Sequence, residues 1–446
     1  MGKGKALIAM SGGVDSSVAA MLTVEAGYDC AGVTMQLFKS SDNVFAGASG
    51  SNRPKPPPSE DARCPAPPHS EDARCPAPPH CKDVRCPAPH SSDADHPAAP
   101  SEDARAVASK LGIPFFVYDF SNEFSKHVVE RFVNAYLGGI TPNPCIYCNQ
   151  NIKFDRFLQL AIDNGYNYTA TGHYARIERC GERYLLRKGL DAAKDQSYVL
   201  YMLTQEQLRH TIFPLGELTK NEVRAIARAQ GLANADKRES QDICFVPDGD
   251  YAKFIETYVE AAKAATAAAA AKLSAAATSA TAAGAATAAP ATVATTSGGG
   301  CSAIPKNGAI VDMDGNILGE HRGIYHYTIG QKKGLGSLAS PNVSRPLYVC
   351  ELHPETNTVV VGPAEMLCAK TLTARNINFI AIDKLDAPLR ASVKIRYNQA
   401  EQPAIVEQIG ADVLRIDFDS PQRAITKGQA IVLYEGDLVI GGGTIL

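Results

Sequence analysis

The sequence predicts an α/β fold in which a doubly wound parallel sheet is followed by a small central domain and a C-terminal β-barrel. Three observations support this prediction. Apolar runs alternate with helical patterns in the first half of the chain, a loop rich in glycine and serine follows the first of these runs, and short β-rich runs fill the end. Strands that alternate with helices form parallel sheets, whereas successive short strands form barrels or sandwiches.

The strands of the parallel sheet are expected at apolar runs that are separated by helical patterns. In chain order these runs are 6–10, 31–37, 114–119 and 168–171. Ligands of such sheets bind beyond the carboxyl ends of the strands, which is where residues 11–17 would lie. The loop after the first strand is therefore the first candidate for a binding site.

The pattern changes from about residue 370 onward, where β-rich runs are separated by Gly, Asp and Pro turns. These runs lie at 391–397, 404–409, 413–418 and 430–434. They indicate a small β-barrel or sandwich. Because 446 residues exceed what one core accommodates, we expect three domains, with the bounds 1–215, 216–368 and 369–446.

Two segments look inserted into this framework. Residues 39–100 are rich in Pro, Ser, Asp and His and contain tandem copies of one short segment, of which only the last, 101–105, leads into a helical pattern. We interpret the earlier copies as duplicated, mostly disordered sequence. Residues 261–300 are rich in Ala and Thr and have no large apolar face. We interpret them as a linker with a transient helical tendency.

The first insert also carries regularly spaced side chains of metal-ligand type. Duplication explains this spacing without a metal, and the neighbouring prolines prevent a compact ligand cage. No metal site is therefore predicted there. The residues in question are Cys64, Cys75, Cys81, Cys86, His69, His80 and His90.

Composition excludes some classes of protein and favours others. The net charge of −3 and the pI of about 6.4 give no global basic field, so nucleic acid would have to bind at a local patch. No apolar run is long enough to predict a membrane span. The twelve irregularly spaced cysteines favour a reducing compartment. We expect a monomer in the cytoplasm, or in a mitochondrion or plastid if a transit peptide is missing.

The loop at Ser11-Gly12-Gly13-Val14-Asp15-Ser16 is suited to phosphate binding. Two glycines let the backbone approach an anion, hydroxyls add donors, and the following helix would point its free N–H groups at the ligand. The lysine of a Walker loop is absent. A turn that merely opens a helix is the alternative. The loop resembles the PP-loop of ATP pyrophosphatases, the ATPases of the adenine nucleotide alpha hydrolase-like fold, which adenylate a substrate and release pyrophosphate.

Further segments resemble the tRNA-specific 2-thiouridylases over nearly the whole chain except the inserts. The two most diagnostic read TPNPCIYCNQNIKF at 141–154 and SQDICF at 240–245. Others read TGHY at 171–174, GLD at 189–191, KDQSY at 194–198, HYTIGQKKG at 326–334, KIRY at 394–397 and GQ at 428–429. A PP-loop alone is shared with many ligases, but matching segments in this order are specific to the family.

The resemblance implies ATP-dependent 2-thiolation of the wobble uridine of tRNA, with Mg²⁺, the anticodon arm of tRNA and a sulfur-relay donor as partners. It assigns the persulfide to Cys244 and the nucleophile to Cys148, which would end as a disulfide, with Asp15 and Cys145 as further catalytic residues. The nucleotide would contact Ala9, Met10, Ser11, Gly12, Gly13, Val14, Asp15, Ser16, Met35 and Gly172. The tRNA would contact Asn143, Pro144, Cys145, His173, Lys194, Asp195, Gln196, Arg396, Tyr397 and Gln429.

The chain departs from the family pattern at Cys145, where Asp is common. Cys145 would then replace an acid–base residue or act as a spare redox group. Alternatively, Cys145, Cys148 and Cys244 would hold an iron–sulfur cluster with one open iron. The persulfide route requires reactive cysteines, and we expect thiols that are accessible and have a low pKa.

Two other classes of protein remain possible from the sequence. A PP-loop ligase that forms amide bonds would share the loop but would have no use for Cys148 and Cys244. A non-catalytic RNA-binding or sulfur-carrier protein would tolerate a degenerate loop, whereas residues 11–16 match the motif. Pyrophosphate release that depends on tRNA would distinguish a 2-thiouridylase from both of these classes.

Overall fold

The computed structural model describes residues 3–38, 100–232, 234–237, 243–281, 307–336, 338 and 345–446. The repeats of the first insert, with their cysteines and histidines, lie outside the described residues. So do the segment 238–242 before Cys244 and residues 282–306 of the second insert and its flank. No helix in the described part is long and apolar enough to cross a membrane.

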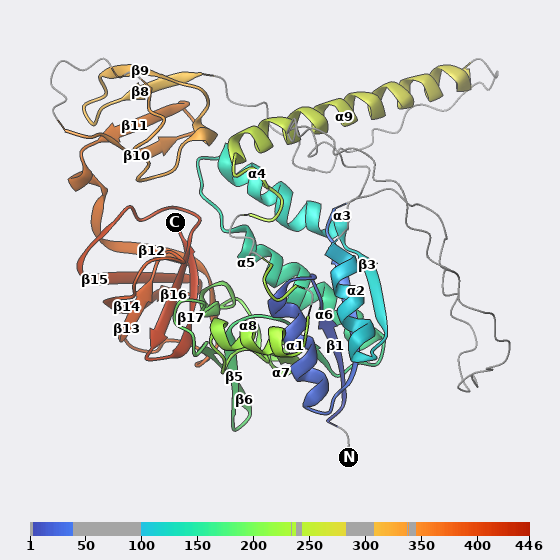
Figure 1. Cartoon of the computed structure of the whole chain (residues 1–446). Helices are drawn as coiled ribbons and strands as arrows, with labels where there is room; N and C mark the ends of the chain where they lie inside the picture. The colour runs from blue at the N-terminus through green and yellow to red at the C-terminus, as the bar shows by residue number, and fades with distance from the viewer. Residues whose placement is uncertain are drawn as a thin grey trace, which may run out of the picture.

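A parallel sheet with the strand order β3-β2-β1-β4-β7 forms the first part of the fold (Figure 1). Alternate residues of the central strand face opposite sides, because successive side chains of a strand do so. Ala6 and Ile8 pack into one core, and Leu7 and Ala9 into another. The strands are β1 (Lys5–Ala9), β2 (Asp29–Gln36), β3 (Phe115–Asp119), β4 (Tyr168–Ala170) and β7 (Thr211–Ile212).

Helices cover both faces of this sheet, which confirms the doubly wound architecture. One face carries α1 (Val14–Glu25), α2 (Pro100–Leu111) and α8 (Lys220–Ala229). The other is covered by α3 (Ser121–Phe124), η2 (Ser125–Val129), α4 (Glu130–Leu137), α5 (Pro144–Cys148), η3 (Asn149–Arg156) and α6 (Phe157–Asp163). The last repeat copy begins α2, as predicted, and the helix ends before Gly112, whose φ is +68°.

The C-terminal strands form a closed antiparallel barrel, so the sandwich alternative is wrong. Their order is β12-β15-β14-β13-β16-β17, and pairing between β12 and β17 closes the ring. Val393, Val406, Ile416 and Leu433 fill its interior. The strands are β12 (Cys368–Phe379), β13 (Leu389–Lys394), β14 (Gln402–Gly410), β15 (Val413–Arg423), β16 (Ala430–Glu435) and β17 (Leu438–Ile445).

A small mixed sheet with the order β10-β11-β8-β9 lies between these parts in the sequence. Its strands are β8 (Gly308–Val311), β9 (Ile317–His321), β10 (Tyr348–His353) and β11 (Thr358–Gly362), with the short helices η5 (Ile324–His326) and η6 (Ala364–Leu367) alongside. This sheet has its own core, which includes Ile310, Val349 and Val361. The described strands thus agree with a small central unit.

The helix α9 (Tyr251–Thr281) includes the described part of the second insert, so the helical tendency expected of residues 261–281 is present as a continuous helix. Phe254, Ile255 and Val259 anchor its first turns in the core under α4. The rest of the helix is rich in alanine, and it stays helical because alanine has the highest helix propensity. In Figure 1 this continuation projects away from the rest of the fold.

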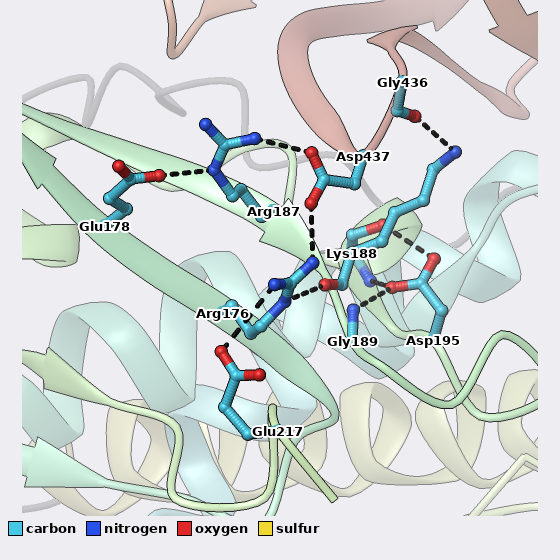
Figure 2. Close-up of polar contacts among 10 residues, drawn as sticks. Arg176, Glu178, Arg187, Lys188, Gly189, Asp195, Glu217, Gly436 and Asp437 are labelled. Atoms are coloured by element: carbon cyan, nitrogen blue, oxygen red, sulfur yellow. Dashed lines mark hydrogen bonds and ion pairs between the residues drawn. The ribbon is translucent and has the colours of Figure 1, made fainter. Parts of the chain in front are cut away.

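A hairpin formed by β5 (Ala175–Cys180) and β6 (Arg183–Lys188) joins the sheet of the barrel through β17. Asp437 accepts hydrogen bonds from Arg176 Nη2 at 2.6 Å and from Arg187 Nη1 at 2.5 Å (Figure 2). Lys188 Nζ donates to the carbonyl of Gly436 at 2.8 Å. These contacts fix the hairpin against the barrel, and the chain continues through η4 (Ser197–Val199) and α7 (Gln205–Arg209).

Replacing Asp437 with Asn should destabilise the protein by about 1 kcal/mol at pH 7, since two half-exposed ion pairs weaken together. Burial opposes ionisation of Asp437, but the hydrogen bonds and charges of Arg187 and Arg176 outweigh it and lower the pKa. Because its pKa is lowered in the folded state, the ionised carboxylate stabilises the fold at pH values above the unfolded-state pKa of about 3.9. This stabilisation is lost as the pH falls through the lower pKa of the folded state. Urea titrations should therefore show the difference at pH 7 and its decrease below about pH 4.

The matched control is Asp386→Asn, which removes an exposed ion pair with Lys384 at 2.7 Å. This variant should change the free energy of unfolding by less than about 0.5 kcal/mol. Equal effects of the two variants would show that the hairpin does not depend on Asp437.

Candidate active site

The glycine-rich loop connects β1 to α1 and leaves the start of the helix open. Gly12 has a φ of +74°, which side chains rarely adopt, and Gly13 caps the helix without a side-chain hydrogen bond. The hydroxyls of Ser16 and Ser17 donate to the carbonyl of Gly13 at 3.0 and 2.9 Å. The first N–H groups of α1 thus have no side-chain cap, and such a helix start binds phosphate.

Residues from distant parts of the chain hold this loop. Lys220 at the start of α8 donates to both carboxylate oxygens of Asp15, at 2.7 and 2.8 Å, and Tyr174 donates its hydroxyl at 2.7 Å. Asn234 Nδ2 donates to the carbonyl of Gly12 at 3.1 Å and to Ser17 Oγ at 2.8 Å. Sequence reasoning did not identify Lys220 or Asn234 as site residues, because no local motif marks them. It quoted Tyr174 within the TGHY segment but gave it no role.

A cavity of about 290 Å³ opens beside the loop, at the carboxyl ends of β1, β2 and β4. Among the residues expected to bind nucleotide, Ala9, Met10, Ser11, Asp15, Ser16, Met35 and Gly172 line it. Gly12 and Gly13 shape the loop, and Val14 is buried in the core behind it. His173 and Gln196, expected to contact tRNA, also line this cavity, as do Thr34, Leu37, Lys153 and Thr171, which the sequence did not single out.

Gly172 is where the end of β4 meets the start of α1. A Cβ atom added there would lie 2.9 Å from the backbone atoms Asp15 C and Ser16 N. Real Cβ contacts are essentially never this short, and these neighbours are backbone atoms that cannot move independently. Only glycine therefore lets the helix start sit this close to the floor of the cavity.

The cysteines of the two diagnostic segments meet in space. Cys148, at the end of α5, is buried in the same core as Phe245, the residue after Cys244. Ile243, on the other side of Cys244, packs against the same core, and Cys148 and Cys145 are near enough to contribute to the raised pKa of Cys244. All three are free thiols. Segments about 95 residues apart thus converge, as the sulfur-transfer hypothesis requires.

The expectation of low thiol pKa values is wrong for this form of the chain. Desolvation raises the pKa of Cys145 and Cys148, and Lys153 opposes it. Desolvation, with the nearby Cys148 and Cys145, raises the pKa of Cys244 to about 12. The physical reason is desolvation by the surrounding chain, which disfavours the thiolate, although only Cys148 is a buried residue and Cys145 and Cys244 are exposed, as expected. The thiols are therefore neutral near pH 7.

The alternative of an iron–sulfur cluster finds no support among the described residues. Among the described residues, no group of three or more His, Cys, Asp or Glu side chains is arranged to hold a metal ion. Cys145, Cys148 and Cys244 are neighbours without forming such a ligand set. Asp15 is the one carboxylate among the described residues that line the cavity, and both its oxygens accept hydrogen bonds from Lys220.

The loop before α5 is held by the barrel. Asn143 precedes the helix in extended conformation and Pro144 is its first residue, where the missing N–H costs nothing. Gln429 Nε2 donates to the carbonyl of Thr141 at 2.8 Å, and the N–H of Thr141 donates to the carbonyl of Lys427. Gln429 thus connects the barrel to the segment that carries Cys145 and Cys148.

The segment 194–197 is built by internal hydrogen bonds. The buried carboxylate of Asp195 accepts from the N–H of Gly189 (Figure 2). It also accepts from the N–H and the Oγ of Ser197. Gln196 Oε1 accepts from the N–H of Tyr174 at 3.0 Å. Asp195 therefore shapes the segment, while the partly buried Lys194 lies at its start. A role of these residues in tRNA contact stays a prediction.

Tyr397, His173 and Arg396 differ in how much they can offer to a ligand. Tyr397 is 37% exposed and donates its hydroxyl to the carbonyl of Asp195 at 3.2 Å. Desolvation, then Asp195 and Cys145, raise its pKa. His173 is buried, and desolvation followed by the charge of Lys153 lowers its pKa well below 6.5, so it is neutral. Arg396 Nη2 donates to Thr426 Oγ1 and to the carbonyl of Ala424 in the connection between β15 and β16.

The fold and the loop define a nucleotide-binding α/β protein with two cysteine segments beside the nucleotide cavity. Three family descriptions match the chain: "tRNA methyl transferase HUP domain" at residues 4–61 and 89–248, "tRNA methyl transferase PRC-barrel domain" at 302–363, and "Aminomethyltransferase beta-barrel domain" at 369–445. The chain is 40% identical to tRNA-specific 2-thiouridylase MnmA of Clostridioides difficile over 99% of this chain and 98% of that protein.

Other relatives agree with this match. The enzyme of the same name from Acetivibrio thermocellus is 39% identical over 100% of both chains. The chain belongs to the family of tRNA-specific 2-thiouridylases. A solved 4-thiouridine synthetase–RNA complex with bound ATP overlaps 57% of this chain and 50% of that chain at 17% identity, with a TM-score of 0.30, an overlap too weak to support a functional comparison.

Proposed function

We propose that this chain uses ATP to replace the 2-oxygen of the wobble uridine of tRNA with sulfur. The observation that carries the proposal is that Lys153 lines the cavity five residues after Cys148, which packs in the same core as Ile243 and Phe245 on either side of Cys244. The family descriptions mention methyl transfer, but methyl transfer does not require both an ATP-binding loop and a pair of thiols. Sulfur chemistry needs both.

The reaction proceeds in two stages. The uridine O2 attacks the α-phosphorus of ATP, and pyrophosphate leaves. The C2 oxygen, a poor leaving group by itself, can then leave as part of AMP. The start of α1 and the loop would stabilise the departing charge. The terminal sulfur of a Cys244 persulfide then attacks C2 and AMP leaves with the electron pair of the C2–O bond.

The cysteine pair completes the transfer. A Cys148 thiolate attacks the Cys244 sulfur, the persulfide S–S bond breaks, sulfur stays on C2, and a Cys148–Cys244 disulfide forms. Attack before the transfer would instead release sulfide as the nucleophile. In either case an external dithiol reduces the disulfide. Because both thiols are neutral in the free chain, bound substrate has to favour the thiolate of Cys148.

The remaining assignments rest on the family and on placement. The three parts 1–215, 216–368 and 369–446 would respectively adenylate the base, face the tRNA and grip the anticodon arm. Mg²⁺ would enter with ATP, and a sulfur-relay protein would load Cys244. We further propose a monomer that works in the cytoplasm, as the curated relatives come from bacteria.

The experiment is a nucleoside analysis of tRNA by mass spectrometry from cells that lack this protein. We expect loss of 2-thiouridine derivatives and their recovery when the full chain is supplied. Unchanged 2-thiouridine would contradict the proposal. In purified form, pyrophosphate release should require tRNA, whereas an amide-forming ligase would require an amine instead.

The cluster alternative is tested separately by metal content. Protein purified without oxygen should contain no stoichiometric iron or acid-labile sulfide and should still thiolate tRNA with a persulfide donor. Iron and sulfide in stoichiometric amounts, with activity lost on their removal by a chelator, would favour the three-thiolate cluster over the persulfide route.

A further inference from the structure

Lys153 stands out because it is the one Lys or Arg among the described residues that line the nucleotide cavity. The nearby Lys220 is bound to both oxygens of Asp15 and is 9% exposed. Its charge is therefore already paired. ATP would bring several negative charges into this cavity, and Lys153 is a second cation there that can pair with them.

The local helix geometry turns Lys153 toward the cysteine side. Cys148 ends α5, and η3 (Asn149–Arg156), which follows without a break, is a π-helix. In a π-helix, hydrogen bonds join residues five apart, so such residues lie roughly one above the other. In an α-helix, residues five apart would differ by about 140° around the axis. The wider turns thus bring Lys153 to the side of the helix that carries Cys148.

The surroundings of Lys153 agree with this placement. Its charge acts on the thiols of Cys145, Cys148 and Cys244, and also on His173 at the cavity wall. His173 is neutral and so offers no competing charge. Lys153 itself is half-buried. It is therefore positioned between the place where a nucleotide would lie and the place where sulfur would arrive.

We propose that Lys153 binds the α-phosphate of the nucleotide, first in ATP and then in the adenylated uridine, and so holds the activated base against the cysteine pair. This inference rests on the proposed function. When sulfur attacks C2, the C2–O bond breaks and AMP takes the electron pair and an additional negative charge. The ammonium of Lys153 stabilises that charge, which is larger in the transition state than in the bound substrate.

The test compares Lys153→Gln and Lys153→Arg with the wild-type full chain. The assay is a single turnover with ATP, unmodified tRNA, a low-molecular-weight persulfide and a dithiol, in which pyrophosphate, AMP and 2-thiouridine are measured. We expect Lys153→Gln to slow 2-thiouridine and AMP formation by about 100-fold, with less change in tRNA affinity. Lys153→Arg should recover part of the rate, because it keeps the charge.

The control is Lys126→Gln, which removes an exposed lysine from another π-helix, η2. It should thiolate at the wild-type rate, and thermal unfolding should show that all variants fold. A Lys153→Gln variant that folds and thiolates at the wild-type rate would overturn the inference, as would an equal loss in Lys153→Arg. If the wild type itself makes no 2-thiouridine, the proposed function fails instead.

Discussion

Replacing Cys148 or Cys244 with serine is expected to abolish 2-thiouridine formation, with a loss of at least about 1000-fold, while leaving ATP binding nearly unchanged. Serine is close in size to cysteine, so the buried site of Cys148 should stay packed. Its hydroxyl, however, neither carries a persulfide nor attacks one. Tests of single-turnover thiolation and of tRNA-dependent pyrophosphate release separate sulfur transfer from adenylation.

Cys180→Ser is the matched control, because Cys180 is a free, exposed cysteine on the β5–β6 hairpin. It should thiolate like the wild type. Cys145→Ser adds a distinction: it should retain most activity if Cys145 is a spare group, and it should lose activity if Cys145 replaces the acid–base residue of the family. Normal thiolation by either Cys148→Ser or Cys244→Ser would show that the roles assigned to the pair are wrong.

The second large effect is expected at Gly172, where Gly172→Val should remove ATP binding. The added side chain would meet the backbone of Asp15 and Ser16 at the 2.9 Å given above for Cβ alone, and so displace the first turn of α1. A displacement of about 1 Å in a positioned site costs on the order of 100-fold. Gly172→Ala should show a smaller loss. Isothermal titration with ATP measures both.

Gly410→Ala is the control for this series. A Cβ atom at Gly410 would meet Val413 at 3.5 Å, an ordinary contact, in a barrel strand. Its ATP affinity should equal that of the wild type. If Gly172→Val binds ATP normally while remaining folded, then the start of α1 is not the phosphate site.

Local patterns in the sequence were sufficient for much of the fold. The four predicted strands of the parallel sheet all exist within two residues of their expected bounds, because each is a largely apolar run next to a helical pattern, although β3 is mostly exposed. The two-residue strand β7 is too short to produce such a pattern. In the barrel, β12 and β17 were missed. Much of β12 is exposed, and β17 contains Gly441, Gly442 and Gly443, which the neighbouring backbone requires but which predict turns in isolation.

The amino-acid sequence alone determined the nucleotide loop, the two cysteine segments and the family, because each is a run of neighbouring residues with recognisable chemistry. Tertiary structure decided the partners and the electrostatics. Lys220, Tyr174 and Asn234 reach the loop from about 160 to 220 positions away in the chain. Burial likewise raised the thiol pKa values, since desolvation depends on everything packed around a group and on no single segment.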